Sequence, residues 1–517
     1  MNTLGGAMRN LSGASRRAAV LLACCAGAFA VAAILIVPAS RAASPPAYTH
    51  YSGTLTDGST WIANVPTTWN GTLIIFTHGL VANDVAVDAG SPDVQNELLN
   101  AGYALAGDSF DPTGPLWPLA TAVNDDFQTI TTLENSVLPS APKQVISMGE
   151  SLGGLISALM AQDAGGRITG SLNVCPLVDG GEVFGNYLLD GSYALNELLD
   201  PSESIPLANY SSESQAEQAG DQLMALAQSA QSTAAGRARI ALASALFDTP
   251  TWTSVNVGGI DSNPKVKTTP LPPPLGNYDA WEQGQYNTEY APGSIVLPYD
   301  GQNRWAMEQA SGGQPAWDAG ADFTTLIDDS PYYPEISALY TEAGLDLNTD
   351  LQTLTANADI TSNADALASL ISTSVPTGSL QVPELDLHTI ADQLVPIQQE
   401  NYYQQLVDSA GDGSQLGHAY VFRQGHCHFE TGEVVAAVEA LSERLTTGSW
   451  GTLLAPSSLN AAAASYGGGD FVAYSPPALT GVNPAPSSSS TAPSSSSSAA
   501  LTPTPLRRPR LFRFLRR

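Results

Sequence analysis

Residues 144–154 of this 517-residue chain read QVISMGESLGG, and this stretch decides the fold. It contains the pattern Gly-x-Ser-x-Gly, with Ser151 between an apolar strand (144–148) and a predicted helix. The flanking glycines let the backbone make a strained turn that exposes the serine hydroxyl. The pattern is short enough to occur by chance, but its place between strand and helix makes Ser151 a candidate nucleophile. The alternative is an ordinary serine in a strand–helix turn.

The segments around this stretch alternate between strands and helices. Asp57-Gly58 marks a hairpin turn between two alternating segments, and apolar spacing predicts a helix over 125–137. The further strands predicted by apolar runs are 51–55, 60–65, 72–77, 103–106 and 170–174. This alternation predicts an α/β fold with a mainly parallel central sheet and helices on both faces.

The alternation stops for a long helix-rich segment and then resumes. We therefore expect one sheet domain that is interrupted by a large helical cap insertion. The predicted parts are a signal peptide (1–42), a first core segment (43–180), the cap (181–375), a second core segment (376–455), and a Ser/Pro-rich disordered linker with a basic C-terminal tail (456–517).

A serine nucleophile needs a general base and an acid that orients the base. Asp392 and His426 follow two of the resumed strands, which gives the order Ser, Asp, His along the chain. Asp179 competes for the role of the acid, and His428 competes with His426. His50, His388 and His418 are interpreted as structural.

Backbone N–H groups can stabilise the negative oxygen that forms when a serine attacks a carbonyl. The expected donors are Leu152, directly after the serine, and Leu80, in the loop Thr77-His78-Gly79-Leu80. The sequence contains no metal-binding motif and no Gly-rich phosphate loop after a strand, so it predicts neither a metal nor a cofactor.

Four motifs in this order resemble the α/β-hydrolase superfamily. They are Thr-His-Gly (77–79), Gly-Glu-Ser-Leu-Gly-Gly (149–154), Asp-x-x-Val-Pro (392–396) and Gly-His-Cys (425–427). The chain is particularly similar to secreted bacterial α/β hydrolases that have a large helical cap and a Gly-His-Cys loop. The resemblance covers about residues 54–447, with one departure at Glu150, where many relatives carry His.

The resemblance implies that Ser151 is the nucleophile, Asp392 the acid and His426 the base, with Leu80 and Leu152 as oxyanion donors. It further implies a secreted serine hydrolase that cleaves carboxylic esters of small molecules or polymers through an acyl-enzyme intermediate. The alternatives are a serine peptidase of the prolyl-aminopeptidase type and, in another class, a non-catalytic extracellular binding protein.

Two cysteines, Cys175 and Cys427, lie outside the apolar N-terminal segment. Each follows a predicted strand, so both belong at the carboxyl edge of the sheet, and an exported protein meets an oxidising compartment. We expect a disulfide that holds the histidine loop over Ser151. The alternative is two buried thiols.

The N-terminal segment predicts export, and the C-terminal tail is a candidate for contact with the cell envelope. Arginines precede the apolar run Ala18–Val37, and small residues follow it, as in a cleaved secretory signal. The run is also long enough to act as a membrane anchor, which is the alternative. Ser-rich low-complexity sequence precedes the arginine-rich C-terminal tail (507–517), and both the tail and the anchor are candidates for contact with the cell envelope.

The middle of the chain is strongly acidic. All 49 Asp and Glu lie there, whereas ten of the 19 Lys and Arg lie in the first 41 or last 11 residues, and the net charge is −30. Such a body repels phosphate backbones, which excludes a nucleic-acid partner. At 43% hydrophobic and 13% charged residues, the chain can bury a large core, which excludes wholesale disorder.

Overall fold

The computed structural model describes residues 46–81, 85–252 and 272–482. The predicted signal segment, the Ser-rich linker after residue 482 and the arginine-rich tail lie outside the described residues. In the described part of the chain, no helix combines the length and the apolar character needed to cross a bilayer.

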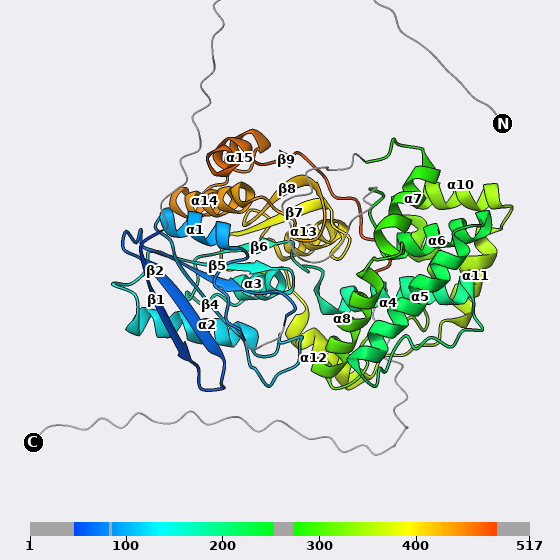
Figure 1. Ribbon diagram of the computed structural model, residues 1–517, viewed down its shortest axis with the longest axis horizontal. Helices are drawn as coiled ribbons and strands as arrows, with labels where there is room; N and C mark the ends of the chain where they lie inside the picture. The colour runs from blue at the N-terminus through cyan, green and yellow to red at the C-terminus, as the bar shows by residue number, and fades with distance from the viewer. Residues whose placement is uncertain (1–45, 82–84, 253–271, 483–517) are drawn as a thin grey trace, which may run out of the picture. The chain divides into compact units, whose positions relative to one another are not determined.

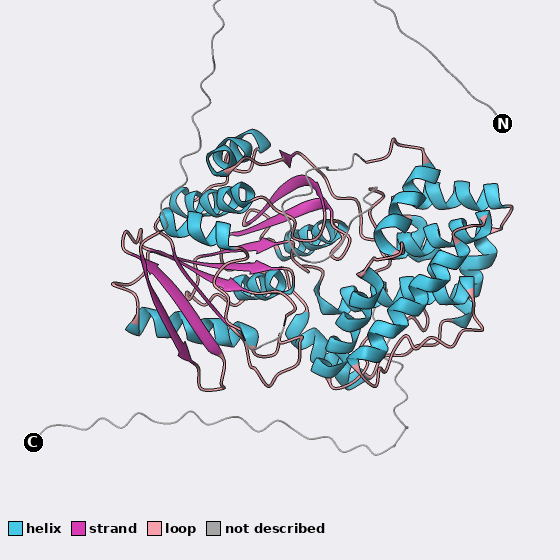
Figure 2. Ribbon diagram, viewed as in Figure 1, coloured by secondary structure: helices cyan, strands magenta, loops and turns pink. Residues whose placement is uncertain are grey.

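The core is a nine-stranded sheet in the order β1-β2-β4-β3-β5-β6-β7-β8-β9 (Figures 1 and 2). Its strands are β1 (Tyr48–Thr54), β2 (Thr60–Pro66), β3 (Thr72–Thr77), β4 (Ala104–Asp108), β5 (Gln144–Glu150), β6 (Gly170–Val174), β7 (Glu384–Ala391), β8 (Leu416–Gln424) and β9 (Phe471–Val472). β1 pairs antiparallel with β2, β2 with β4, and β8 with β9. The other neighbouring strands pair parallel. The predicted hairpin and the mainly parallel sheet are confirmed.

Helices cover both faces of the sheet, so its central strands are buried on both sides. β3 reads TLIIFT and every residue in it is buried, as is typical of a parallel strand between two helical layers. On one face lie α1 (Pro92–Asn100) and α14 (Thr431–Thr447). On the other lie α2 (Ala122–Ser136), α3 (Leu152–Gln162) and α13 (Gln398–Ala410).

A helical region leaves the sheet after β6 and returns before β7, where the sequence predicts the cap insertion. Its helices are α4 (Gly180–Leu199), α5 (Glu213–Ala230), α6 (Ala234–Leu246), α7 (Tyr278–Glu289), α8 (Val296–Ser311), α9 (Phe323–Asp328), α10 (Tyr333–Ala343), α11 (Leu347–Asn357) and α12 (Ala364–Ser374). They gather beside the carboxyl edge of the sheet (Figure 1). Gln399 of α13 donates to the Tyr187 hydroxyl of α4, which joins core and cap.

The predicted boundary between core and disordered tail at 455/456 is wrong for residues 456–482. This segment forms α15 (Pro456–Ala463), a 3₁₀ turn (Ala464–Tyr466) and β9. It then crosses to the cap, where the Thr480 N–H donates to Asp248. The segment is rich in Ala, Ser and Gly, but Leu459 and Phe471 are buried in the core and order it.

Candidate active site

Ser151 lies on a sharp turn between β5 and α3, with φ 59° and ψ −122°. The two glycines of the motif are required by close approaches of the backbone. A Cβ on Gly149 would lie 1.9 Å from the Gly153 carbonyl oxygen, and one on Gly153 would lie 2.0 Å from that of Thr77. A non-glycine residue at positive φ stores strain, and here the strain presents the serine hydroxyl at the edge of the sheet.

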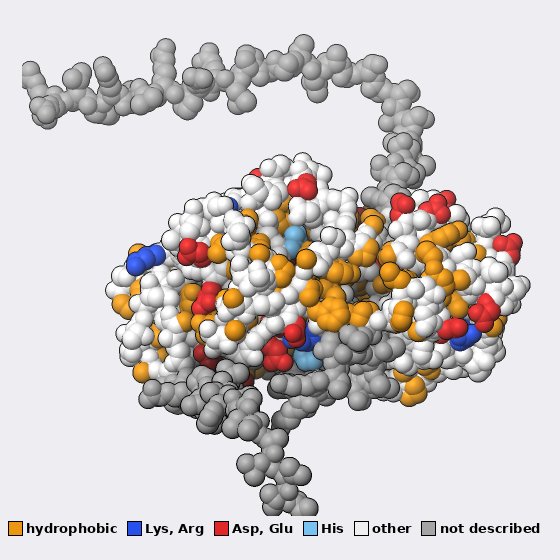
Figure 3. All heavy atoms as spheres, turned by 90° about the horizontal axis from the view of Figure 1, so that it is seen from above, with side chains coloured by type: hydrophobic (Ala, Val, Ile, Leu, Met, Phe, Trp, Pro, Cys, Tyr) orange, Lys and Arg blue, Asp and Glu red, His pale blue; other side chains and the backbone are white. Residues whose placement is uncertain are grey.

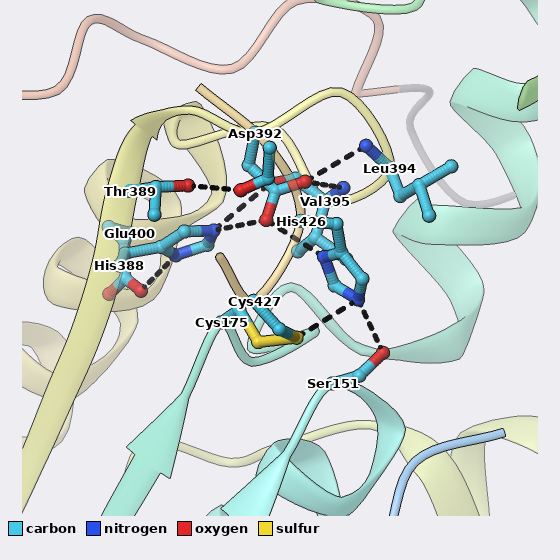
Figure 4. Close-up of a disulfide and its surroundings, with 11 residues drawn as sticks. Ser151, Cys175, His388, Thr389, Asp392, Leu394, Val395, Glu400, His426 and Cys427 are labelled. Atoms are coloured by element: carbon cyan, nitrogen blue, oxygen red, sulfur yellow. Dashed lines mark hydrogen bonds and ion pairs between the residues drawn. A yellow bond between two sulfur atoms is a disulfide. The ribbon is translucent and has the colours of Figure 1, made fainter. Parts of the chain in front are cut away.

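Ser151, His426 and Asp392 form a hydrogen-bonded chain (Figure 4). Ser151 Oγ lies 2.8 Å from His426 Nε2, and His426 Nδ1 lies 2.8 Å from Asp392 Oδ2. With Nδ1 protonated, Nε2 accepts the hydrogen bond from the serine hydroxyl. The structure thus brings together three residues that are 241 and 34 positions apart in sequence and that follow β5, β7 and β8.

Asp392 is completely buried yet strongly stabilised as a carboxylate. Its Oδ1 accepts hydrogen bonds from the N–H groups of Leu394 and Val395, both at 2.9 Å. Burial by itself would raise the pKa of Asp392, but His426 and His388 outweigh burial and hold the pKa well below its usual range. The carboxylate is therefore charged wherever His426 could work as a base.

His388, interpreted from the sequence as structural, lies behind Asp392. Its Nδ1 donates to Glu400 Oε1 at 2.7 Å and its Nε2 to the Val395 carbonyl oxygen at 3.0 Å, with Asp392 Oδ2 at 3.5 Å. Burial lowers the pKa of His388, but the bonds to Asp392 and Glu400 raise it to about 9. Both ring nitrogens thus donate hydrogen bonds. The buried imidazolium holds the loop 392–396, here called the acid loop, through Val395 and Asp392. Only the polar alternation of Glu384, Asp386 and His388 along a buried strand signals this role in sequence.

The two competing residues lie elsewhere. Asp179 precedes α4, and its carboxyl oxygens have no hydrogen-bond partner among the described residues. Burial raises the pKa of Asp179 well above its usual value. His428 Nδ1 faces the Gln424 carbonyl oxygen at 3.2 Å rather than Ser151.

The segments that contain the predicted oxyanion donors adjoin the serine. Leu152 is the first residue of α3, so its N–H has no acceptor within the helix. A Cβ on Gly79 would lie 3.2 Å from Ser151 Cβ, which places the loop after β3, one residue before Leu80, against the nucleophile. No metal or cofactor is needed for this chemistry.

Cys175 and Cys427 form the predicted disulfide, with their Cα atoms 5.3 Å apart. It joins the end of β6 to the histidine loop, and Cys427 Sγ lies 3.3 Å from His426 Nε2. Both cysteines have positive φ, 45° and 50°. On the other side of the loop, the Arg423 guanidinium donates to the His428 carbonyl oxygen at 3.0 Å.

Glu150, the residue before the nucleophile, points toward the loop that contains Gly90. A Cβ on Gly90 would lie 2.3 Å from Glu150 Oε2, so glycine makes room for the carboxyl group. Burial raises the pKa of Glu150 to about 7, and attraction to His426 limits the rise. The group therefore titrates near neutral pH beside the candidate base.

The strand order, the strained serine and its histidine define a serine hydrolase with the α/β-hydrolase fold. No family model matches the chain. It is 26% identical over 444 residues to the o-phthalyl amidase of Xanthobacter agilis, and the match covers 81% of this chain and 91% of the relative. Among solved structures it is similar to feruloyl esterase B of Aspergillus oryzae (12% identical, TM-score 0.39, 78% of this chain and 82% of that one). It is also similar to an esterase from the same organism (11%, TM-score 0.38, 78% and 80%).

Proposed function

We propose that this chain cleaves carboxylic esters through an acyl-enzyme intermediate. The observation that carries the proposal is the unbroken hydrogen-bonded chain Ser151–His426–Asp392 on a strained strand–helix turn. This arrangement is the minimal machinery for acyl transfer by an activated serine.

In this proposal each residue takes one step. His426 Nε2 takes the proton as Ser151 Oγ attacks the ester carbonyl, and Asp392 stabilises the imidazolium that forms. The N–H groups of Leu80 and Leu152 stabilise the negative oxygen of the tetrahedral intermediate. His426 then returns the proton to the departing alcohol, and the same steps with water release the acid and restore Ser151.

A second candidate reaction is hydrolysis of an amide. The relative from Xanthobacter agilis is named an amidase and spans most of this chain. The same serine machinery can cleave either bond, since the acyl-enzyme is the same and only the leaving group differs. Hydrophobic side chains gather in the middle of the face in Figure 3, whereas acidic ones are scattered.

Covalent labelling with a fluorophosphonate tests the serine assignment. The probe should label Ser151 in the wild type, as located by peptide mass spectrometry, and should not label Ser151→Ala. A binding protein without turnover would remain unlabelled. The rates of hydrolysis are then compared across p-nitrophenyl esters of graded acyl length, phthalyl amides and aminoacyl anilides. The comparison shows which kind of bond the enzyme cleaves fastest. Faster hydrolysis of anilides than of every ester would replace the esterase proposal by the peptidase.

We further propose that the protein is exported and works outside the cell. The support is the sequence of the N-terminal segment, with arginines, an apolar run and small residues in that order. The cysteine pair suits an oxidising compartment. Expression of the full chain and N-terminal sequencing of protein from the medium tests this proposal. Retention of the intact N-terminus in a membrane fraction would support the anchor instead.

A further inference from the structure

One face of β7 is polar although it is buried. Glu384, Asp386 and His388 alternate along the strand and are fully buried, so they project from the same face. That face is covered by α13, which contributes Glu400. The opposite face carries Leu385 and Leu387 and packs against α14. Ionisable groups inside a protein are costly unless they are paired or bind a metal, so this face calls for an explanation.

Three side chains from three elements converge here. One potential ligand atom from each of Asp386 (β7), Glu400 (α13) and His418 (β8) lies within 4.8 Å of the other two. His418 Nδ1 lies 3.2 Å from Glu400 Oε2 and 3.9 Å from Asp386 Oδ2. Within the described residues, none of these three atoms makes a hydrogen bond of acceptable geometry. Asp386 and Glu400 are almost completely buried, at 0% and 1% exposure.

The other polar atom of each side chain is fixed by a hydrogen bond. His418 Nε2 lies 2.9 Å from Gln404 Oε1, to which it donates. Asn173 Nδ2 donates to Asp386 Oδ1 and His388 Nδ1 donates to Glu400 Oε1, both at 2.7 Å. Because Nε2 donates to Gln404, Nδ1 is the His418 nitrogen that faces the two carboxylates and that can bind an ion. Metal ligands in proteins are oriented by outer hydrogen bonds of this kind.

In the part of the chain that the structure describes, histidines are the side-chain cations that reach these carboxylates. Among the ion pairs of the described residues, Asp386 and Glu400 pair only with His388 and His418. His388 is already used by Glu400 Oε1 and by the acid loop. A divalent cation bound to these three atoms, which have no hydrogen-bond partner among the described residues, would balance the charge of the two carboxylates.

We propose that Asp386, Glu400 and His418 bind a divalent metal ion, with Zn²⁺ as the best match. One imidazole nitrogen and two carboxylate oxygens are ligands that Zn²⁺ accepts at about 2.0–2.2 Å. The ion joins β7, β8 and α13 and does not touch the substrate. Through Glu400 and His388 it stabilises the loop that contains Asp392. The proposal does not depend on which bond Ser151 cleaves.

Metal analysis of the purified full chain tests this site. We expect close to one equivalent of zinc per chain, either as isolated or after incubation with Zn²⁺ and removal of excess. A chelator should lower the thermal midpoint by several degrees and Zn²⁺ should restore it, since a metal bound only by the folded state stabilises that state.

Two variants and one control locate the metal. Asp386→Asn keeps the side-chain volume, and His418→Ala removes the nitrogen ligand. Both should lose zinc and the response to chelator while retaining the far-UV CD spectrum. His50→Ala, at an exposed histidine of β1, should bind zinc like the wild type. The proposal would be overturned if the wild type held no zinc after incubation with Zn²⁺ and its thermal midpoint did not change with chelator. Full zinc binding by Asp386→Asn would also overturn it. The former result would mean that protons shared between the carboxyl groups balance the cluster.

Discussion

His426 and His428 are two residues apart, but only one of them can reach Ser151. His426 Nε2 lies 2.8 Å from Ser151 Oγ, whereas His428 faces a backbone carbonyl oxygen. We expect His426→Ala to lower kcat by about 10⁴–10⁶-fold, and His428→Ala to change it by less than about tenfold. Steady-state kinetics on one ester measures both variants. An inactive His428→Ala beside an active His426→Ala would reverse the assignment.

Glu150 gives the activity a predicted pH signature. Its pKa is raised to about 7, so the carboxyl group becomes charged across neutral pH and then favours the imidazolium that His426 forms during the reaction. We expect Glu150→Gln to be close to wild type in kcat/KM at pH 6 and several-fold slower at pH 8. The pH profiles of both enzymes, measured on the same ester, test this prediction. A ratio that stays constant from pH 6 to pH 8 would remove Glu150 from the reaction.

Within the elements that bear the site, the disulfide sets the position of the histidine loop. It connects the end of β6 to the residue after His426. The closed loop spans 252 residues, for which chain entropy gives an upper limit on the order of 5 kcal/mol of stability. The catalytic effect should be larger, since a small displacement of His426 breaks its bonds to Ser151 and Asp392. Mild reduction should therefore lower activity before the far-UV CD signal changes.

The matched control for this experiment is the double variant Cys175→Ala/Cys427→Ala. It should have low activity and should not respond to the reductant, which separates loss of the bridge from other effects of the reagent. If the wild type kept full activity after both thiols became alkylatable, the bridge would have no role in positioning His426.

Elements with regular local patterns could be predicted from sequence, and those ordered by distant contacts could not. The elbow at Ser151, the β1–β2 hairpin and the helical region between β6 and β7 all have local signals. α15 and β9 have none, since Phe471 is ordered by packing on the core and by pairing with β8. Leu385 and Leu387 of β7 pack on one face of the sheet, and the role of the polar residues on the other face depends on the packing of α13 against them.

Across the whole molecule, acidic residues outnumber the cations that could pair with them. There are 49 Asp and Glu against 19 Lys and Arg in the full chain. In the cap, burial raises the pKa of Glu289 and of Asp300 well above the usual value, and the attraction of Arg304 does not offset this rise at Asp300. The composition could predict the charge imbalance, but which acids are buried depends on how the cap helices pack.

This imbalance predicts that the fold is most stable in mild acid. Burial raises the pKa of Asp248 to about 8 and that of Glu335 to about 9, whereas both groups titrate near about 4 in an unfolded chain. Their contribution to the free energy of unfolding is thus fully present below about pH 4, declines as the pH rises, and is lost once the pH passes the folded-state pKa. Asp392, with a lowered pKa, opposes this trend only in strong acid. The thermal midpoint should therefore fall steadily from pH 5 to pH 9.

Glu335→Gln tests the origin of this slope. Glu335 is buried at the start of α10, and its only side-chain hydrogen bond among the described residues is one that it accepts from Gln285, at 3.4 Å. Because glutamine does not ionise, the variant should match the wild type near pH 5 and be the more stable protein at pH 9, so its midpoint falls less steeply. The exposed Glu134→Gln on α2 serves as the control and should follow the wild-type curve at every pH. Differential scanning calorimetry across this range measures all three proteins. An equally steep fall in Glu335→Gln would show that the loss of stability in alkali comes from net charge repulsion rather than from ionisation of the buried carboxyl groups.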